Sequence, residues 1–468
     1  MSEPRVVVER QPVAIDTLLA AIAAAAESTG EEAYLVGGFV RDRLLGREGK
    51  DIDILTVGGD ADGSDILRQV AESFGWARPQ LFERFGTGQA RGDGWVVEVV
   101  QARAERYDPA SRRPEVRPGT LDEDIWRRDF TVNALCQTFT GTVLDRTGRG
   151  LDDLAAGVLR TPLDPHETFS EDPLRMFRAA RFVSQLGFTL APGVIEAIRV
   201  QADRAAILSV ERIRDELRRL LTGDHPSRGI EVLRQGGLLD AVLPEVAAMV
   251  GVEQSGYHTH DVYWHTLHAV DAAPADLVTR TAVLLHDVGK PPCHAVDAAG
   301  RHTFHEHPSV GAAMATEILE RLRFSNQEIS DVAALVRLHL RPIQYRAETH
   351  SDSALRRLIR DAGPLRDRML EVARADTRAS SFPDTDAIEE LAERMAQLDG
   401  DGGVSRFRPP LDGHQIMKLA GGRNHGPWIG VAQRALEEAV LDGHLAAGDT
   451  EAARRWLLEE RPDLLREG

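Results

Sequence analysis

The segment LVGGFVRDRLLGREGKDIDIL, residues 35–55, constrains the fold of this chain more than any other. The apolar residues before its two glycines favour a strand, and FVRDRLLG after them favours a helix. The second apolar run, which carries Asp51 and Asp53, favours another strand. Side chains two residues apart on a strand point to the same face, so the two carboxylates are expected to project together. The segment therefore predicts a strand, a glycine turn, a helix and a strand with paired acids.

The paired carboxylates predict a site for divalent cations. Carboxylate oxygens are ligands for Mg²⁺, and two metal ions about 4 Å apart can clamp the attacking and leaving oxygens of a phosphoryl or nucleotidyl transfer. Gly37 and Gly38 have no Cβ, so their backbone N–H groups can approach a phosphate at the start of the helix, within reach of Arg41. Taken singly, a diglycine or a pair of acids also fits an ordinary turn with solvated carboxylates.

The composition predicts a folded protein with several domains, since 468 residues include 42% hydrophobic residues. Cys136 and Cys293 are the only cysteines, too few for a disulfide framework, which favours the reducing cytoplasm. The apolar stretch at 18–26 is flanked by acids and too short to span a bilayer, so we expect an amphipathic helix and no membrane partner. A net charge of −18 argues only weakly against a nucleic-acid partner, because basic residues can gather on one face.

The spacing of apolar residues changes near Asp152 and predicts an α+β fold. Before this point strand-like and helix-like segments alternate, with a helix expected at Asp65–Phe74. After it, helical periodicity dominates. Further boundaries are expected near 249–255 and in the Gly- and Pro-rich 399–413. The predicted parts are a head with a mixed sheet and three helical parts, a neck, a body and a tail: residues 1–152, 153–248, 249–398 and 399–468.

Two motifs downstream supply further candidate site residues. Glu98, within the apolar WVVEVV, is a third carboxylate that can ligate a metal or accept the proton of an attacking 3'-hydroxyl. The alternative is a Glu on an edge strand that faces water. RRDFTVNA at 127–134 presents two guanidiniums beside Asp, Thr and Asn, which can bind phosphate and sugar hydroxyls. By itself this motif also fits a capped helix start.

The motif EDPLR contains a candidate selector of the nucleobase. Asp172 and Arg175 are three residues apart, so they are expected to be neighbours on one helix face. A carboxylate can accept from an exocyclic amino group while a guanidinium donates to a ring nitrogen, a pattern that cytosine and adenine share. Uracil and guanine would leave buried polar groups unpaired. The alternative is an ordinary surface ion pair.

In this order, GGxVRD, DxD, RRDFTxNA and EDxxR resemble the signature of the polymerase-β nucleotidyltransferase superfamily, in its bacterial tRNA nucleotidyltransferase and poly(A) polymerase branch. The resemblance covers roughly residues 30–240. It implies a polymerase-β-like head, an all-α neck, and Mg²⁺ bound by Asp51 and Asp53, with Glu98 as the third acid. The residues that it assigns to the nucleotide are Gly38, Arg41, Arg128, Asp172, Arg175, Arg178 and Arg181.

EDxxR resembles the base-selecting motif of the class II tRNA nucleotidyltransferases. This implies template-independent addition or repair of the 3'-terminal CCA of tRNA from CTP and ATP. The polar stretch Ala102–Asp124 resembles the flexible loop with which such enzymes proceed from C to A addition, and favours full CCA addition. The alternative is a bacterial poly(A) polymerase, which shares the head and neck. Such enzymes usually carry a basic C-terminal tail, whereas 451–468 mixes both signs.

Eleven of the 16 histidines lie between His258 and His350. This region resembles the HD superfamily of metal-dependent phosphohydrolases, and its minimal ligand set comprises His265, His286, Asp287 and Asp376. Imidazole and carboxylate ligands suit a divalent metal such as Ni²⁺ or Mn²⁺. The alternative is a polar cluster without metal, in a helical domain that only holds the tRNA.

Three more residues near this set have open roles. His307 and His339 either complete a second metal position or cap helices, and Lys290 either binds phosphate or is solvated. A second alternative for the whole chain is a phosphohydrolase whose head only binds nucleotide. The sequence leaves the oligomeric state open.

Overall fold

The computed structural model describes residues 13–466, apart from 59–61, 83–85, 107–114, 255–259, 401–408, 422–423 and 447. The chain divides into two compact units, each made of two segments. The first contains Met1–Leu208 and Glu231–Ala241, and the second contains Ser209–Ile230 and Val242–Gly468. The three boundaries expected from the sequence stay a prediction, and most of the expected linker at 399–413 lies outside the described residues.

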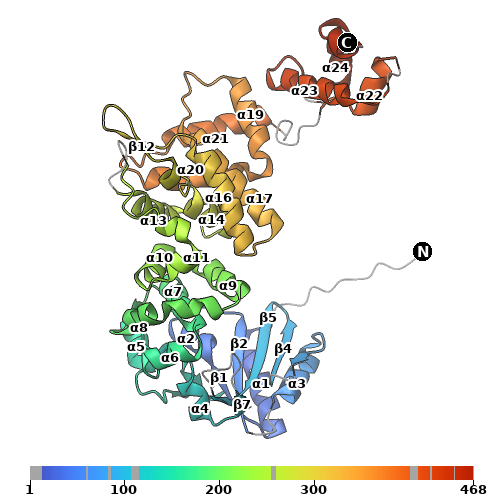
Figure 1. The fold of residues 1–468 in the computed structure, drawn as a ribbon. Coiled ribbons are helices and arrows are strands. Elements are labelled where there is room, and N and C mark those ends of the chain that lie inside the picture. The colour runs from blue at the N-terminus through green and yellow to red at the C-terminus, as the bar shows by residue number, and fades with distance from the viewer. Residues whose placement is uncertain are drawn as a thin grey trace, which may run out of the picture. The chain divides into compact units, whose positions relative to one another are not determined.

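The first unit contains a mixed sheet, as predicted (Figure 1). Its strand order is β3-β4-β5-β2-β1-β8-β9, in which β2 and β5 run parallel and all other neighbours run antiparallel. The strands expected at YLV, DIDILTV and WVVEVV are confirmed. The bounds are β1 Glu32–Val36, β2 Asp51–Val57, β3 Gln80–Phe82, β4 Thr87–Gly92, β5 Trp95–Gln101, β8 Cys136–Gln137 and β9 Val143–Leu144.

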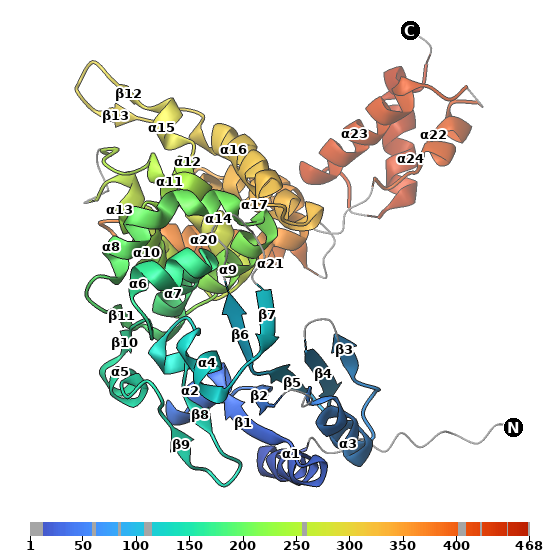
Figure 2. The ribbon, with the colours of Figure 1, turned by 60° about the horizontal axis from the view of Figure 1, so that its bottom comes forward.

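Helices α1 (Ile15–Thr29) and α3 (Ser64–Phe74) pack against each other beside this sheet (Figure 2). Ile52 and Ile54 are fully buried. Gly88 of β4 allows close packing against α3, because a Cβ added there would lie 2.6 Å from Leu67 Cδ1. The residues that alternate with this buried set on β2 and β5 project from the opposite face of the sheet, and these include the acids.

Helix α2 (Gly37–Leu44) begins at the first glycine, where the sequence predicted a turn before the helix. Gly37 has φ +67°, a left-handed conformation that side chains rarely adopt. A Cβ at this position would lie 3.2 Å from Asp53 Oδ2. Glycine therefore allows the Asp53 carboxylate to approach the start of α2.

The predicted loop at Ala102–Asp124 contains regular structure at both ends. Strands β6 (Arg103–Arg106) and β7 (Glu115–Pro118) form an antiparallel hairpin, and α4 (Leu121–Trp126) follows (Figure 2). A capping box at Thr120 starts α4, because the Thr120 side chain accepts from Glu123 N while the Glu123 side chain accepts from Thr120 N. The middle of the predicted loop, 107–114, lies outside the described residues.

Helices dominate the described residues after Asp152, as predicted, interrupted by the short strand pairs β10–β11 (Val158–Leu159, Thr189–Leu190) and β12–β13 (Ala295–Val296, His302–Thr303). The helices that contain candidate site residues, or end directly before them, are α6 (Pro165–Glu171), α7 (Leu174–Leu186), α13 (Val262–Ala272), α14 (Leu277–Leu285), α16 (His307–Arg321), α17 (Asn326–Leu338) and α20 (Arg366–Arg378). In the described part of the chain, no helix has both the length and the apolar character needed to cross a membrane.

Candidate functional site

The register of the central strands places the acids side by side. Asp53 of β2 lies opposite Glu98 of β5, and Glu98 lies opposite Gln89 of β4. Glu98 is half-buried, and its Oε1 accepts a hydrogen bond from Gln89 Nε2. The edge-strand alternative for Glu98 is wrong, because β5 has neighbours on both sides.

The acids form a cluster of like charges around Asp53. Burial and the neighbouring Glu98 carboxylate raise the pKa of Asp53 to about 6, although Arg128 opposes this rise. Asp51 is exposed at the start of β2 and raises the pKa of Asp53 further. Carboxylate oxygens suit a hard cation, and a cation would relieve this crowding of like charges, so the residues fit Mg²⁺.

Both arginines of RRDFTVNA are held by one acid. Asp124 is fully buried and pairs with Arg127 and Arg128, the latter at 2.9 Å. Burial opposes ionisation, but the two guanidiniums lower the pKa of Asp124. Arg128 Nη1 also donates to Asn133 O at 3.1 Å and lies 3.4 Å from a Cβ added at Gly37. Asp124 is not among the residues predicted from the sequence, although its spacing of three and four residues from these arginines is typical of helical ion pairs.

A buried chain of polar contacts joins α2 to α7 within the first unit. Arg41 Nη1 donates to Asn133 Oδ1 at 2.6 Å, and Asn133 Nδ2 donates to Asp129 Oδ1 at 3.0 Å. The other oxygen of Asp129 accepts from Arg178 Nε at 2.6 Å. Two arginines that are 137 positions apart are thereby fixed through one amide and one carboxylate.

Three of the predicted nucleotide-binding arginines gather around one aromatic ring. The guanidinium carbons of Arg181, Arg41 and Arg178 lie 4.2, 5.1 and 5.2 Å from the centroid of Phe182. The negative face of an aromatic ring stabilises a nearby cation. The structure therefore concentrates positive charge in the head unit, in an arrangement able to bind a polyanion such as a triphosphate.

Replacing Asp129 with asparagine should lower the free energy of unfolding by about 2 kcal/mol at pH 7. Burial opposes its ionisation, but Arg178 and the Asn133 amide lower the pKa of Asp129 from 3.8 to about 2. A lowered pKa means that this stabilisation is complete above pH 3.8 and disappears as the pH falls toward 2. Urea unfolding of both proteins between pH 7 and pH 3 measures the difference, which should shrink below pH 4.

The exposed Asp203 supplies a control, since Asp203→Asn should leave the unfolding free energy within about 0.5 kcal/mol of the original protein. A difference between Asp129→Asn and the original protein that is absent at pH 7, or that stays constant down to pH 3, would contradict the role of this carboxylate.

Asp172 and Arg175 do not share a helix face, in contrast to the prediction. Asp172 is extended, between α6 and α7, and its Oδ1 accepts from Leu174 N at 3.0 Å. Pro173 explains why the helix is interrupted at Asp172, because a proline sterically disfavours the helical conformation of the residue before it. Arg175 is buried and donates to Glu171 Oε2, Thr168 O and Arg127 O. The last contact links the EDPLR and RRDFTVNA motifs.

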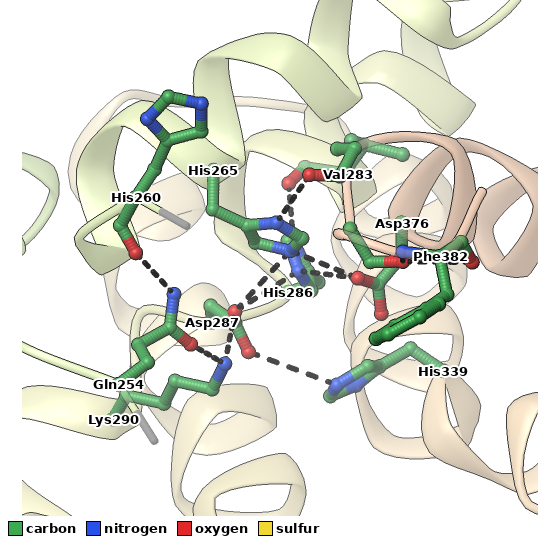
Figure 3. A network of polar contacts seen from close by, with 12 residues as sticks. Gln254, His260, His265, Val283, His286, Asp287, Lys290, His339, Asp376 and Phe382 are labelled. Atoms are coloured by element: carbon green, nitrogen blue, oxygen red, sulfur yellow. Dashed lines mark hydrogen bonds and ion pairs between the residues drawn. The ribbon is translucent and has the colours of Figure 1, made fainter. Parts of the chain in front are cut away.

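The second unit brings the predicted histidine and aspartate ligands together from within, or directly after, several different helices (Figure 3). Among the residues that the structure describes, the groups of three possible metal ligands whose donor atoms all lie within 4.8 Å of one another are both found here. The first contains His265, His286 and Asp376, and the second contains Asp287, His307 and His339. The head acids do not form such a group.

All four histidines of these groups have the same orientation. The Nδ1 atoms of His265, His286, His307 and His339 each face a backbone carbonyl oxygen, at 3.3, 2.7, 2.8 and 2.7 Å. A neutral imidazole that donates from Nδ1 carries its lone pair on Nε2. The backbone therefore selects the tautomer that offers Nε2 to a metal or a carboxylate.

The Nε2 atoms converge on the two aspartates. His265 Nε2 lies 2.9 Å from Asp376 Oδ1, and His286 Nε2 lies 3.1 Å from Asp287 Oδ2. His286 Nε2 is buried and makes no hydrogen bond. Burial disfavours the charged imidazole, but Asp287 and Asp376 raise the pKa of His286 to about 9. Imidazoles and carboxylates around a buried nitrogen without a hydrogen bond fit a divalent transition metal.

Lys290 belongs to this cluster and is not a solvated side chain. It is buried, and its Nζ lies 2.6 Å from Asp287 Oδ2 and donates to Gln254 Oε1 at 2.5 Å. Burial opposes ionisation of Asp287, but His286 and Lys290 lower the pKa of this carboxyl well below its usual range. The second unit therefore keeps a negatively charged aspartate at the centre of the cluster.

Three protein families match the chain in succession. Residues 33–160 match the poly A polymerase head domain, and residues 187–250 match the probable RNA and SrmB-binding site of polymerase A. Residues 256–379 match the HD domain. The first match contains the head acids and the last contains the histidine cluster, and both families point to the use of divalent metal.

Known proteins resemble the chain over nearly its full length. The A-adding tRNA nucleotidyltransferase of Deinococcus radiodurans is 35% identical over 92% of this chain and 96% of the relative. The CC-adding tRNA nucleotidyltransferase of Thermus thermophilus is 33% identical over 92% and 94%. The crystal structure of the Bacillus stearothermophilus CCA-adding enzyme in complex with CTP is 27% identical, with a TM-score of 0.70 over 96% of this chain and 99% of that one. The chain therefore belongs to the HD-containing class II branch of the bacterial tRNA nucleotidyltransferase and poly(A) polymerase family, as its motifs predicted.

Proposed function

We propose that the chain is a template-independent enzyme that adds or repairs the 3'-terminal CCA of tRNA, with CTP and ATP as substrates. One observation carries this proposal: Asp53 and Glu98 are neighbours in the sheet, and Asp53 lies close to Gly37, where α2 begins. The same compact unit contains the arginines that surround Phe182. The relatives named above are called A-adding and CC-adding tRNA nucleotidyltransferases and a CCA-adding enzyme. Their full-length similarity supports the same substrate class for this chain.

In this proposal Asp51 and Asp53 hold Mg²⁺, and Glu98 is the third acid, beside Asp53. Bound Mg²⁺ supplies positive charge to the reacting phosphate and to the attacking 3'-hydroxyl. The backbone at Gly38 and the side chain of Arg41 hold the triphosphate at the start of α2. The residues that complete its binding site are Arg128, Arg178 and Arg181.

Asp172 and Arg175 select the base. Arg175 suits this role because contacts to three oxygens fix its guanidinium, so it cannot turn to accommodate a carbonyl-bearing base. Asp172 is held by the N–H of Leu174 at the start of α7. A fixed donor and a fixed acceptor that both face the incoming base would match cytosine and adenine and would leave uracil and guanine with unpaired polar groups.

The stretch Ala102–Asp124, which contains the strands β6 and β7, resembles the loop of full CCA-adding enzymes and favours full CCA addition over A-only or CC-only activity. Sequence identity does not distinguish between these activities, because one relative at 35% identity is named A-adding and another at 33% identity is named CC-adding. Arg127 Nε donates to Arg103 O at 3.0 Å, so the hairpin is hydrogen-bonded to the RRDFTVNA motif. Since Arg127 and Arg128 share Asp124, a movement of the hairpin would reach the nucleotide-binding arginines.

Incubation of the purified protein with Mg²⁺ and tRNA that ends before CCA tests the proposal. We expect two C residues with CTP alone and a complete CCA with CTP and ATP, resolved on a sequencing gel. Long A tracts would identify a poly(A) polymerase, addition of only C or only A would identify a partial activity, and no extension would exclude nucleotidyl transfer to tRNA.

Replacing Asp172 with alanine should relax the discrimination against UTP and GTP about tenfold or more, because the carboxylate no longer penalises a carbonyl group. Relative incorporation of the four nucleotides into the same tRNA measures this effect. The exposed Glu167 of α6 supplies the control Glu167→Ala, which should keep the original bias. Unchanged rejection of UTP and GTP by Asp172→Ala would contradict the selecting role.

We also propose a second activity, phosphohydrolysis by the HD cluster with Ni²⁺ or Mn²⁺. The uniform orientation of the four imidazoles supports metal binding, and damaged tRNA ends that carry phosphate or cyclic phosphate are the fitting substrates. The two activities would then prepare and rebuild the same RNA end. We infer a cytoplasmic location, which the free thiols Cys136 and Cys293 support.

A further inference from the structure

A row of polar side chains crosses three strands of the head sheet. Gln89 of β4, Glu98 of β5 and Asp53 of β2 are successive partners in the strand register. Directly paired side chains lie on one face of a sheet, so these three are in line. Gln89 is half-buried, and nothing in its sequence context, TGQARG, marks it as a functional residue.

Arg91 fixes the orientation of the Gln89 amide. Arg91 Nε donates to Gln89 Oε1 at 2.7 Å, and the two residues are two positions apart on the same face of β4. A guanidinium has donors and no acceptors, so it can contact only the oxygen of the amide. The amide nitrogen must then face the other way, toward Glu98, where Nε2 donates to Oε1.

The hydrogen bond from Gln89 restricts Glu98. A glutamate side chain has three torsions, and its terminal carboxylate rotates almost freely unless it is held. With one carboxylate oxygen committed to Gln89, the carboxylate is oriented relative to the neighbouring Asp53. Side chains that orient metal ligands or bases in this way contribute about 10- to 100-fold to affinity or activity.

We propose that Gln89 is a positioning residue for nucleotidyl transfer, which acts by holding the Glu98 carboxylate in line with Asp53. This inference rests on the proposed function of the head unit and names a residue on β4 that its motifs do not contain. Gln89 contacts neither substrate nor metal in this scheme. Its contribution passes entirely through Glu98.

Kinetics of C addition by Gln89→Leu tests the role. Leucine keeps a similar side-chain size and removes the N–H donor, so we expect kcat to fall about tenfold or more while the KM for CTP stays within about twofold. Gln80 lies opposite Gln89 on β3, is exposed, and supplies the control Gln80→Leu, which should leave both constants unchanged. Circular dichroism and the thermal midpoint verify that both variants are folded.

A double-mutant cycle separates positioning from a structural effect. If Gln89 acts through Glu98, Gln89→Leu should not slow an enzyme that already carries Glu98→Ala, and the two effects should be non-additive. A second variant, Gln89→Glu, replaces the donor with a negative charge and should reduce kcat at least as much as leucine does.

Three outcomes would overturn the inference: an unchanged kcat in Gln89→Leu, a rise in KM equal to the loss of kcat/KM, or fully additive effects with Glu98→Ala. Failure of the proposed function is distinguishable, because the unmodified protein would then add no nucleotide. An active original protein with an unaffected Gln89→Leu variant would reject only the role of Gln89.

Discussion

Replacing Asp53 with asparagine should abolish nucleotide addition, with a loss of kcat on the order of a thousandfold or more. Asp53 is the acid that lies between Glu98, the start of α2 and Arg128, and it is one of the two proposed Mg²⁺ ligands. Metal ions stabilise the charge that develops in nucleotidyl transfer by several kcal/mol, and each 1.4 kcal/mol corresponds to about tenfold in rate. Single-turnover incorporation of labelled CTP into tRNA that ends before CCA measures this loss.

Asp65 provides the matched control for this substitution. It is exposed in the first turn of α3, so Asp65→Asn removes one carboxylate without touching the sheet. This variant should retain nearly full activity. Because the pKa of Asp53 is raised by burial and by Glu98, asparagine also removes an unfavourable charge, and the inactive variant should be at least as stable as the original protein. Activity of Asp53→Asn within tenfold of the original would contradict the assignment.

Replacing His286 with alanine should remove divalent-metal binding by the second unit and reduce phosphohydrolysis at least a hundredfold. His286 belongs to one three-residue group, and its Nε2 lies 3.1 Å from Asp287 of the other, so its loss disturbs both. Loss of a ligand removes both the metal and the activated water. Phosphate release from a nucleoside 2'-phosphate with Ni²⁺ or Mn²⁺, together with the metal content of the purified protein, measures the effect.

CCA addition by the same variant should stay within about twofold of the original, because the proposed transferase residues all lie in the other compact unit. The control is His268→Ala, on the same helix as His265 but exposed, which should keep both activities. Phosphatase activity that survives His286→Ala would exclude the HD cluster as its source. If the original protein binds no metal at this cluster, the alternative of a purely structural polar cluster gains support.

The sequence predicted the strands and acids of the head because their signals are local. Alternating apolar residues around Asp51 and Asp53 fix both the strand and the face on which the acids lie, and the structure confirms this pattern in β2. The family resemblance, carried by motifs in a fixed order, added the roles that pattern alone cannot assign. Full-length similarity to known tRNA nucleotidyltransferases confirms the family, while the role of each residue is tested by mutation.

Contacts between distant segments lay beyond prediction from the sequence. The pairing of Glu98 with Asp53 depends on which strands are neighbours in the sheet. The sequence of a central strand that contains a single Glu resembles that of an edge strand, so the sequence alone does not distinguish the two. Asp124 was missed because acids on a short helix are usually solvated, and only burial shows that this one holds two arginines. Asp172 was assigned to a helix because the helical period is clear on both sides of Pro173.

The parallel pairing of β2 with β5 has a consequence for how this head can vary among relatives. A shift of one residue in this register would turn Glu98 to the face covered by α1 and α3 and would expose a valine to the acids. Insertions or deletions within β5 should therefore abolish nucleotidyl transfer. The segment between β2 and β5 contains α3 and the strands β3 and β4, and the connections between these elements can change length without altering which residues meet. Length variation in this family is thus expected in these connections, while the two parallel strands stay constant in length.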